Sequence, residues 1–194
     1  MKTCCVKKLA LPVMLFSFVT PVWAHTGIDT THGFMAGFVH PWQGVDHLLV
    51  MFAVGLWASV LSGKILWQLP ITFLLLMAIG AGLNFAGFTL HFAELWVAMS
   101  VLVFGLIISC NWRTSGFWAM GLVVAFAFCH GYVHAAEIAN GADQFGYALG
   151  FLLSTAILMS LGIAANVLGA MGAYVFRMSF GLVSSTAAVF WLAK

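Results

Sequence analysis

Length, composition and charge assign this chain to a broad class of protein before any motif is considered. Of its 194 residues, 63% are hydrophobic and only 6% are Asp, Glu, Lys or Arg, and the mean hydropathy is +1.09. A soluble domain carries roughly 25% charged residues, so this chain could not cover a soluble globule. The same values exclude intrinsic disorder, and the seven basic residues are too few and too scattered to form a nucleic-acid-binding surface. The composition therefore predicts an integral membrane protein whose solvent is largely the lipid bilayer.

The start of the chain has the pattern of a targeting segment. Three lysines fall among the first eight residues, an apolar run of about a dozen residues follows from Leu9 to Val19, and the segment ends with Val22-Trp23-Ala24. Ala24 is a small residue of the kind that signal peptidase prefers, and the apolar run is shorter than the roughly 20 residues needed to span a bilayer. We therefore predict that residues 1–24 form a cleaved signal peptide. The alternative is an uncleaved first helix.

Six apolar segments follow, each of near spanning length. Their approximate bounds are 42–62, 66–85, 92–110, 115–136, 145–166 and 170–192. Lipid offers the backbone no hydrogen-bond partner and the runs are too long for barrel strands, so each spanning segment must be helical. We therefore predict an all-α, polytopic membrane protein, in which residues 25–194 form a bundle of six transmembrane helices.

Basic residues between the segments set the expected orientation. If the mature N-terminus is exported, Lys64 and Arg113 fall in cytoplasmic loops and Arg177 lies within reach of the cytoplasmic surface. The exported loops then carry no Lys or Arg before the terminal Lys194. This orientation agrees with the signal peptide, which is inferred from different residues. We expect a multi-pass protein of the bacterial inner membrane with its mature N-terminus on the periplasmic side.

The residues that could bind a divalent metal ion all gather on the exported half of this topology. They are seven histidines and five acids: His25, His32, His40, His47, His91, His130, His134, Asp29, Asp46, Glu94, Glu137 and Asp143. Ionisable groups embedded in a membrane are costly and are functional candidates by default. Imidazole and carboxylate together are ligands for borderline divalent metals such as zinc, nickel and cobalt. The distribution therefore predicts a metal site on the exported side.

Two clusters contain the main candidates for this site. The first is the sequence His-Pro-Trp-Gln-Gly-Val-Asp-His at residues 40–47, at the start of the first helix. The second has histidines and a glutamate spaced i, i+4, i+7 on one face of the fourth helix. At about 1.5 Å per residue, both clusters reach the same depth from helices that run in opposite directions. We predict that six metal ligands converge there: His40, Asp46, His47, His130, His134 and Glu137.

Single members of this set also have plainer interpretations. A lone histidine in an apolar segment is usually a hydrogen-bonded packing residue, although two histidine-rich clusters at equal depth reverse that preference. Asp46 could orient a histidine instead of contacting the ion. The favoured interpretation remains metal binding by both clusters.

Four further residues are candidates for additional ligands. His91 and Glu94 open the third helix on the same side, although solvation at the membrane interface explains His91 nearly as well. Cys129 could be a soft ligand, but as the neighbour of His130 it points about 100° away round the helix, which favours packing. A free His25 at the mature N-terminus could chelate a cation with its amino group and imidazole, although a flexible polar terminus is the ordinary outcome.

The two clusters resemble the motifs of a known family. Residues 40–47 fit the pattern His-x5-Asp-His, and residues 129–137 resemble Phe-His-Gly-x-Ala/Val-His-Gly-x-Glu. Together with the signal segment and six helices, these motifs are similar to those of the HupE/UreJ family of hydrogenase and urease accessory proteins. The second motif departs twice, with Cys129 in place of phenylalanine and Ala135 in place of glycine. The resemblance extends over essentially the whole mature chain.

The resemblance implies a permease that imports Ni²⁺, or Co²⁺, across the inner membrane for maturation of hydrogenase or urease. The exported His/Asp/Glu cluster would capture the ion, and cytoplasmic metallochaperones are candidate recipients. We expect that the protein is a transporter and not an enzyme. One alternative is an intramembrane hydrolase in which Zn²⁺ activates water beside a carboxylate. The other is a metal-binding accessory protein that does not transport its ion.

Overall fold

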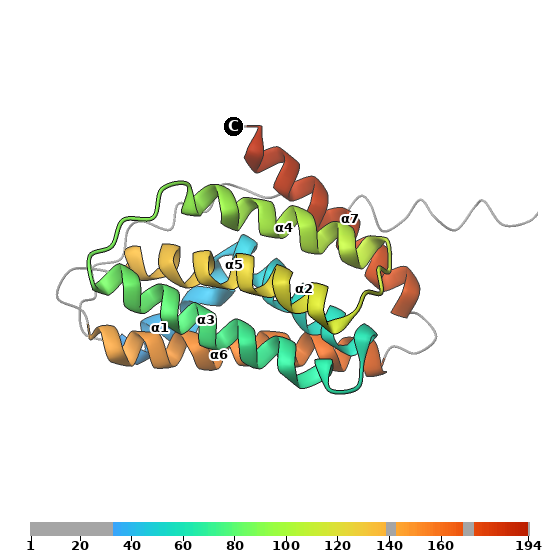
Figure 1. The fold of residues 1–194 in the computed structure, drawn as a ribbon, viewed down its shortest axis with the longest axis horizontal. Coiled ribbons are helices and arrows are strands. Elements are labelled where there is room, and N and C mark those ends of the chain that lie inside the picture. The colour runs from blue at the N-terminus through green and yellow to red at the C-terminus, as the bar shows by residue number, and fades with distance from the viewer. Residues whose placement is uncertain (1–32, 139–142, 169–172, 194) are drawn as a thin grey trace, which may run out of the picture.

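The computed structural model describes residues 33–138, 143–168 and 173–193, and all regular structure within these ranges is helical. Figure 1 shows the helices packed as one bundle, with α7 inclined to the others. Their bounds in chain order are α1 Gly33–Gln43, α2 Val45–Leu61, α3 Ile65–Phe85, α4 Ala93–Ser109, α5 Gly116–Ala136, α6 Gln144–Leu168 and α7 Ala173–Leu192. The all-α prediction is confirmed. The predicted signal peptide and its cleavage point lie outside the described residues.

Helices α2 to α7 correspond one to one with the six apolar segments, but a further helix, α1, precedes them. The prediction had the first helix begin near residue 42, whereas α2 begins at Val45 after a break at Gly44. Gly44 has extended backbone angles, and the axes of α1 and α2 differ by 80° across it. The first apolar segment is therefore the second arm of a bent helix pair.

Four helices are long and apolar enough to cross a membrane, namely α3, α5, α6 and α7. The bent pair of α1 and α2 meets the same criteria when its two arms are taken together, whereas α4 has 17 residues and is shorter than a full span. The described residues thus form a multi-pass membrane protein. The predicted six crossings are reached only if the bent pair and α4 both count as crossings.

Glycines allow the tightest helix contacts in the bundle. A Cβ atom on Gly131 of α5 would collide with the carbonyl oxygen of Met77 in α3, and one on Gly37 of α1 would collide with that of Tyr147 in α6. In lipid, helices associate through such close backbone approach because no hydrophobic force draws them together. These glycines therefore fix α5 against α3 and α1 against α6.

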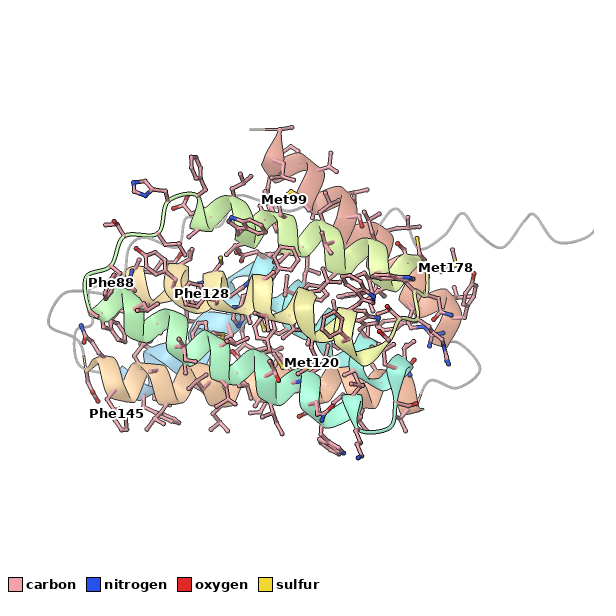
Figure 2. All side chains as sticks on the ribbon, in the orientation of Figure 1. Phe88, Met99, Met120, Phe128, Phe145 and Met178 are labelled. Carbon is pink, nitrogen blue, oxygen red and sulfur yellow. The ribbon has the colours of Figure 1, made fainter. Side chains whose placement is uncertain are left out.

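Helix α2 lies in the interior of the bundle, and beyond Asp46 and His47 in its first turn it is apolar nearly all round, as expected of a largely buried helix. Its Trp57 is fully buried, and the indole Nε1–H donates to the carbonyl oxygen of Trp112 at 2.9 Å. The outer surface is apolar too, since Phe117 and Phe145 are 78% and 75% exposed. Figure 2 shows carbon-rich side chains over the visible face of the bundle. Apolar side chains facing outward match a lipid environment.

Candidate metal centre

The break at Gly44 places two histidines of the first motif at one end of the bundle. His40 lies in the last turn of α1, and His47 lies in the first turn of α2. The second motif reaches the same place from α5, whose last turn contains His134 and whose C-cap is Glu137. Residues distant in sequence thus meet where α1 ends, α2 begins and α5 ends.

Three side chains form a compact group at the more exposed part of this region, which we call the outer trio: His40, His134 and Glu137. Glu137 Oε2 lies 2.9 Å from His40 Nε2 and 3.0 Å from His134 Nδ1, and the two imidazole nitrogens are 3.2 Å apart. One ligand atom from each residue lies within 4.8 Å of the other two, a spacing that could hold a metal ion. Within the described residues, no other group of three His, Cys, Asp or Glu side chains meets this spacing.

Glu137 gives the outer trio a negative charge. Partial burial acts to raise the pKa of Glu137, but hydrogen bonds from His134 and His40 outweigh it and hold the pKa below its ordinary value. The carboxylate is therefore ionised at neutral pH and can only accept hydrogen bonds. His40 Nε2–H and His134 Nδ1–H both donate to it, so the lone pair of neutral His134 is on Nε2.

Three imidazoles pack together deeper in the bundle, and we call them the inner histidines: His47, His130 and His134. All three are buried, and their ring centroids are separated by 4.9 Å (His47 to His134), 5.8 Å (His47 to His130) and 6.0 Å (His130 to His134). His134 belongs to both groups. The outer trio and the inner histidines therefore form one continuous cluster that extends from a partly exposed carboxylate into the bundle.

In each inner histidine, one ring nitrogen forms a hydrogen bond to an oxygen and the other has no hydrogen-bond partner. His130 Nδ1–H donates to the carbonyl oxygen of Phe126 at 3.2 Å, and His47 Nε2 lies 3.0 Å from Thr155 Oγ1. Among the described residues, His47 Nδ1, His130 Nε2 and His134 Nε2 are buried with no hydrogen-bond partner. Buried ring nitrogens normally have a hydrogen-bond partner. In metal-binding histidines, one ring nitrogen typically donates to an oxygen while the other binds the metal ion. These unpaired imidazole nitrogens are therefore donors of the type that a divalent cation binds, although only the outer trio has the spacing of a metal site within the described residues.

The remaining predicted ligands lie outside these groups. Asp46 is half-buried in the first turn of α2 and has no hydrogen bond to a histidine within the described residues. His91, just before α4, and Glu94, in its first turn, are exposed, and neither belongs to the metal-spaced group. Cys129 is buried, with its Sγ 3.8 Å from the carbonyl oxygen of Ala125, as expected of a packing residue. His25 lies outside the described residues.

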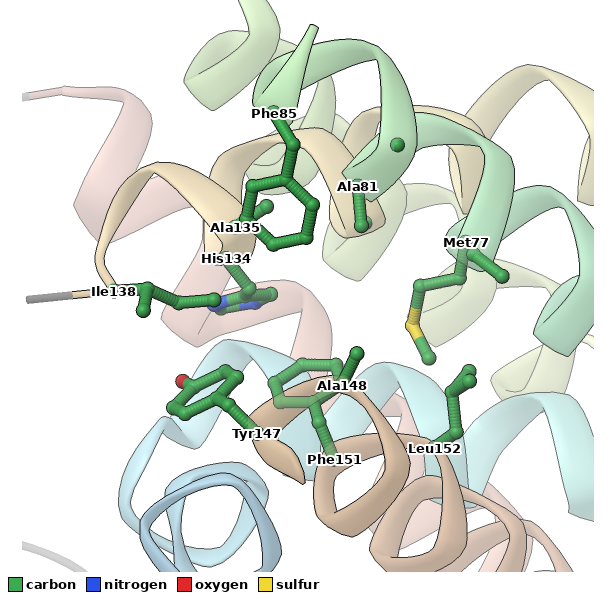
Figure 3. Close-up of a pocket in the computed structure, with 13 residues that line it drawn as sticks. Met77, Ala81, Phe85, His134, Ala135, Ile138, Tyr147, Ala148, Phe151 and Leu152 are labelled. Atoms are coloured by element: carbon green, nitrogen blue, oxygen red, sulfur yellow. The ribbon is translucent and has the colours of Figure 1, made fainter. Parts of the chain in front are cut away.

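An apolar cavity of about 140 Å³ adjoins the cluster between α3, α5 and α6. Figure 3 shows His134 across the cavity from Tyr147 and Phe151, with Phe85 and Met77 of α3 on another side. The Phe151 ring also packs against the histidines, with its centroid 4.7 Å from that of His47 and 5.3 Å from that of His134. The cluster therefore has an apolar, aromatic wall on this side.

The motifs in the sequence do not predict the contribution of α6 to the cluster. Tyr147, Phe151 and Thr155 follow one another at intervals of four residues and share one face of α6. That spacing is visible in the sequence, but aromatic and hydroxyl side chains at helical spacing occur in any membrane helix. Only the packing of α6 against α1 and α2 identifies this face.

The chain is similar to known proteins over most of its length. The family described as HupE / UreJ protein matches residues 13–191. Protein HupE from Rhizobium leguminosarum bv. viciae is 37% identical over 163 residues, which cover 83% of this chain and 85% of that protein. No solved structure matches the chain.

Proposed function

Because this chain belongs to the HupE/UreJ family, we propose that it is a permease that imports Ni²⁺, or Co²⁺, across the bacterial inner membrane for hydrogenase or urease maturation. The observation that supports this proposal best is the buried cluster of histidines with an ionised Glu137 at its more exposed end. A dehydrated divalent cation needs such donors, because a membrane interior offers no others.

The outer trio acts first in this proposal. His40 and Glu137 are 23% and 39% exposed, so a hydrated ion can reach them before it meets the buried rings. The carboxylate attracts the cation and the imidazoles replace water in its coordination shell. The ion then passes to the inner histidines, where the leftover nitrogens of His47 and His130 can receive it. We include Asp46 as a second acid close to this path.

The positions of the basic residues support capture from the periplasm. Lys64 follows the end of α2 that is remote from His47, and Arg113 precedes the end of α5 that is remote from Glu137. Arg177 donates to Asn166 near the corresponding end of α6. Positive charge favours the cytoplasmic side. We therefore propose six crossings, a cleaved signal peptide and an exported cluster, with cytoplasmic metallochaperones receiving the ion.

Uptake of radiolabelled Ni²⁺ and Co²⁺ by proteoliposomes of the purified protein tests the proposal. We expect saturable uptake that His130→Ala and His134→Ala abolish, because each removes a donor that water cannot replace cheaply in a buried site. The matched control is His91→Ala, which removes an exposed histidine outside the cluster. Binding without uptake would instead identify a metal-binding accessory protein, and hydrolysis that depends on Zn²⁺ would identify an intramembrane hydrolase.

A further inference from the structure

One face of α6 contacts the metal cluster although neither motif includes any residue of that helix. The ring of Tyr147 lies 5.9 Å from that of His40, and the ring of Phe151 lies 4.7 Å from that of His47. One turn further along, Thr155 Oγ1 lies 3.0 Å from His47 Nε2. Thr155 is fully buried. Among Tyr147, Phe151 and Thr155, Thr155 is the residue that forms a hydrogen bond to an inner histidine.

The other two inner histidines have their tautomers fixed by oxygens that can only accept. The carbonyl oxygen of Phe126 forces the proton of neutral His130 onto Nδ1, and the carboxylate of Glu137 does the same for His134. In both rings the nitrogen without a partner is therefore Nε2, and it carries the lone pair that a metal ion requires.

His47 has the same arrangement with the two nitrogens exchanged. Its Nε2 pairs with Thr155, and its buried Nδ1 has no partner among the described residues. A threonine hydroxyl can donate or accept, so the partner alone does not fix this tautomer. If Thr155 donated, His47 would be left with a buried Nδ1–H, which cannot bind a cation; if Thr155 accepts, His47 is left with a free Nδ1 lone pair, as the other two rings have at Nε2, and the unpaired donor is the Thr155 hydroxyl itself.

We propose that Thr155 is a positioning residue that accepts the Nε2–H of His47 and so keeps the Nδ1 lone pair free for a divalent cation. The cation's identity as Ni²⁺ rests on the proposed function, whereas the tautomer of His47 does not. In this arrangement each inner histidine donates one N–H to an oxygen: His130 to a backbone carbonyl, His134 to a carboxylate and His47 to a hydroxyl. Residues of α6 thereby join the two motifs in forming the site.

A pair of substitutions separates the hydroxyl from the volume of the side chain. Thr155→Val keeps the shape and removes the hydroxyl, and we expect Ni²⁺ affinity of the purified protein to fall about 10- to 100-fold, as is typical for loss of a residue that orients a metal ligand. Thr155→Ser keeps the hydroxyl and should restore most of that affinity. Ser154→Ala is the matched control, because Ser154 is a buried neighbour whose hydroxyl has no partner within the described residues.

The tautomer is measured directly on the metal-free protein by NMR of nitrogen-15-labelled imidazoles, with the His47 signals identified by their absence in His47→Ala. We expect the wild-type protein and Thr155→Ser to carry the proton on Nε2. Thr155→Val should show a mixture of the two tautomers.

A wild-type His47 protonated mainly on Nδ1 would overturn the assignment. Equal Ni²⁺ affinity in the wild-type protein and in Thr155→Val would overturn it as well. If the wild-type protein imports no metal but His47 carries its proton on Nε2, the permease proposal fails and the role of Thr155 in fixing the tautomer stands. Should Thr155→Val fail to fold, the wild-type tautomer and Thr155→Ser still decide the question.

Discussion

Replacing Glu137 by Gln tests the electrostatic part of the site. The substitution preserves the size of the side chain and one acceptor oxygen, but it removes the charge on which His40 and His134 converge at 2.9 and 3.0 Å. The ionised carboxylate is also the acid of the outer trio that would contact an incoming cation. The Glu137→Gln variant would therefore leave the local packing intact and change the charge.

The expected loss follows from the strength of interactions with a charged group. Such an interaction contributes about 1.5–3 kcal/mol, which corresponds to roughly 10- to 100-fold in affinity at about 1.4 kcal/mol per tenfold. Because the Glu137 side chain is 39% exposed, solvent screens part of its charge. We therefore expect Ni²⁺ to bind about tenfold more weakly, at the lower end of this range.

Titration calorimetry of the detergent-solubilised protein with Ni²⁺ measures this change. The matched control is Glu94→Gln, which removes an exposed carboxylate in the first turn of α4 and should leave the affinity unchanged. If Glu137→Gln bound Ni²⁺ as tightly as the wild-type protein, or if Glu94→Gln lost as much affinity, the claim that the negative charge of Glu137 attracts the cation would be refuted.

Three further outcomes follow from the packing, the site chemistry and the N-terminus. Gly131→Ala should destabilise the protein by about 1–3 kcal/mol in thermal unfolding, because its Cβ meets the Met77 carbonyl oxygen, whereas Gly121→Ala faces open space and should be neutral or slightly stabilising. Uptake should fall as external pH drops from about 7.5 to 5.5, because protons compete with the metal for imidazole. Since the pKa of Glu137 lies below its ordinary value, its carboxylate stays ionised throughout, and uptake that is unchanged at pH 5.5 would contradict imidazole ligation. N-terminal sequencing of the membrane-extracted protein should return His25 first, and Met1 would contradict cleavage.

The positions of the helices could be predicted from the sequence, because an apolar run of near spanning length must form its backbone hydrogen bonds within itself in lipid and is therefore helical. The meeting of His47 with His130 was also predictable, since the rise per residue of a helix is nearly constant and fixes depth along its axis. The separate helix α1 was not. Its axis differs by 80° from that of α2, and it packs closely against α6 at Gly37, a lateral contact that the sequence pattern does not indicate.

Lateral packing explains why part of the site escaped prediction as well. The rise per residue gives the position of a residue along its helix axis, but it does not determine which helices pack beside that helix. Phe151 and Thr155 contact the inner histidines because α6 packs beside α2, and no local pattern in residues 144–168 indicates that contact. Asp46 was predicted from its depth in the first helix, which does not fix the direction of its side chain. Asp46 forms no hydrogen bond to the histidines within the described residues, and its role as a metal ligand stays a prediction.

The measurement that tests the central claim most directly is nickel X-ray absorption spectroscopy of the Ni²⁺-loaded protein. If the ion binds the cluster of His40, His47, His130, His134 and Glu137, the spectrum shows nitrogen and oxygen ligands with the outer-shell scattering of several imidazoles. His134→Ala should reduce the imidazole contribution, since His134 belongs to both the outer trio and the inner histidines. A coordination shell that contains sulfur, or one of water and carboxylate alone, would contradict the account.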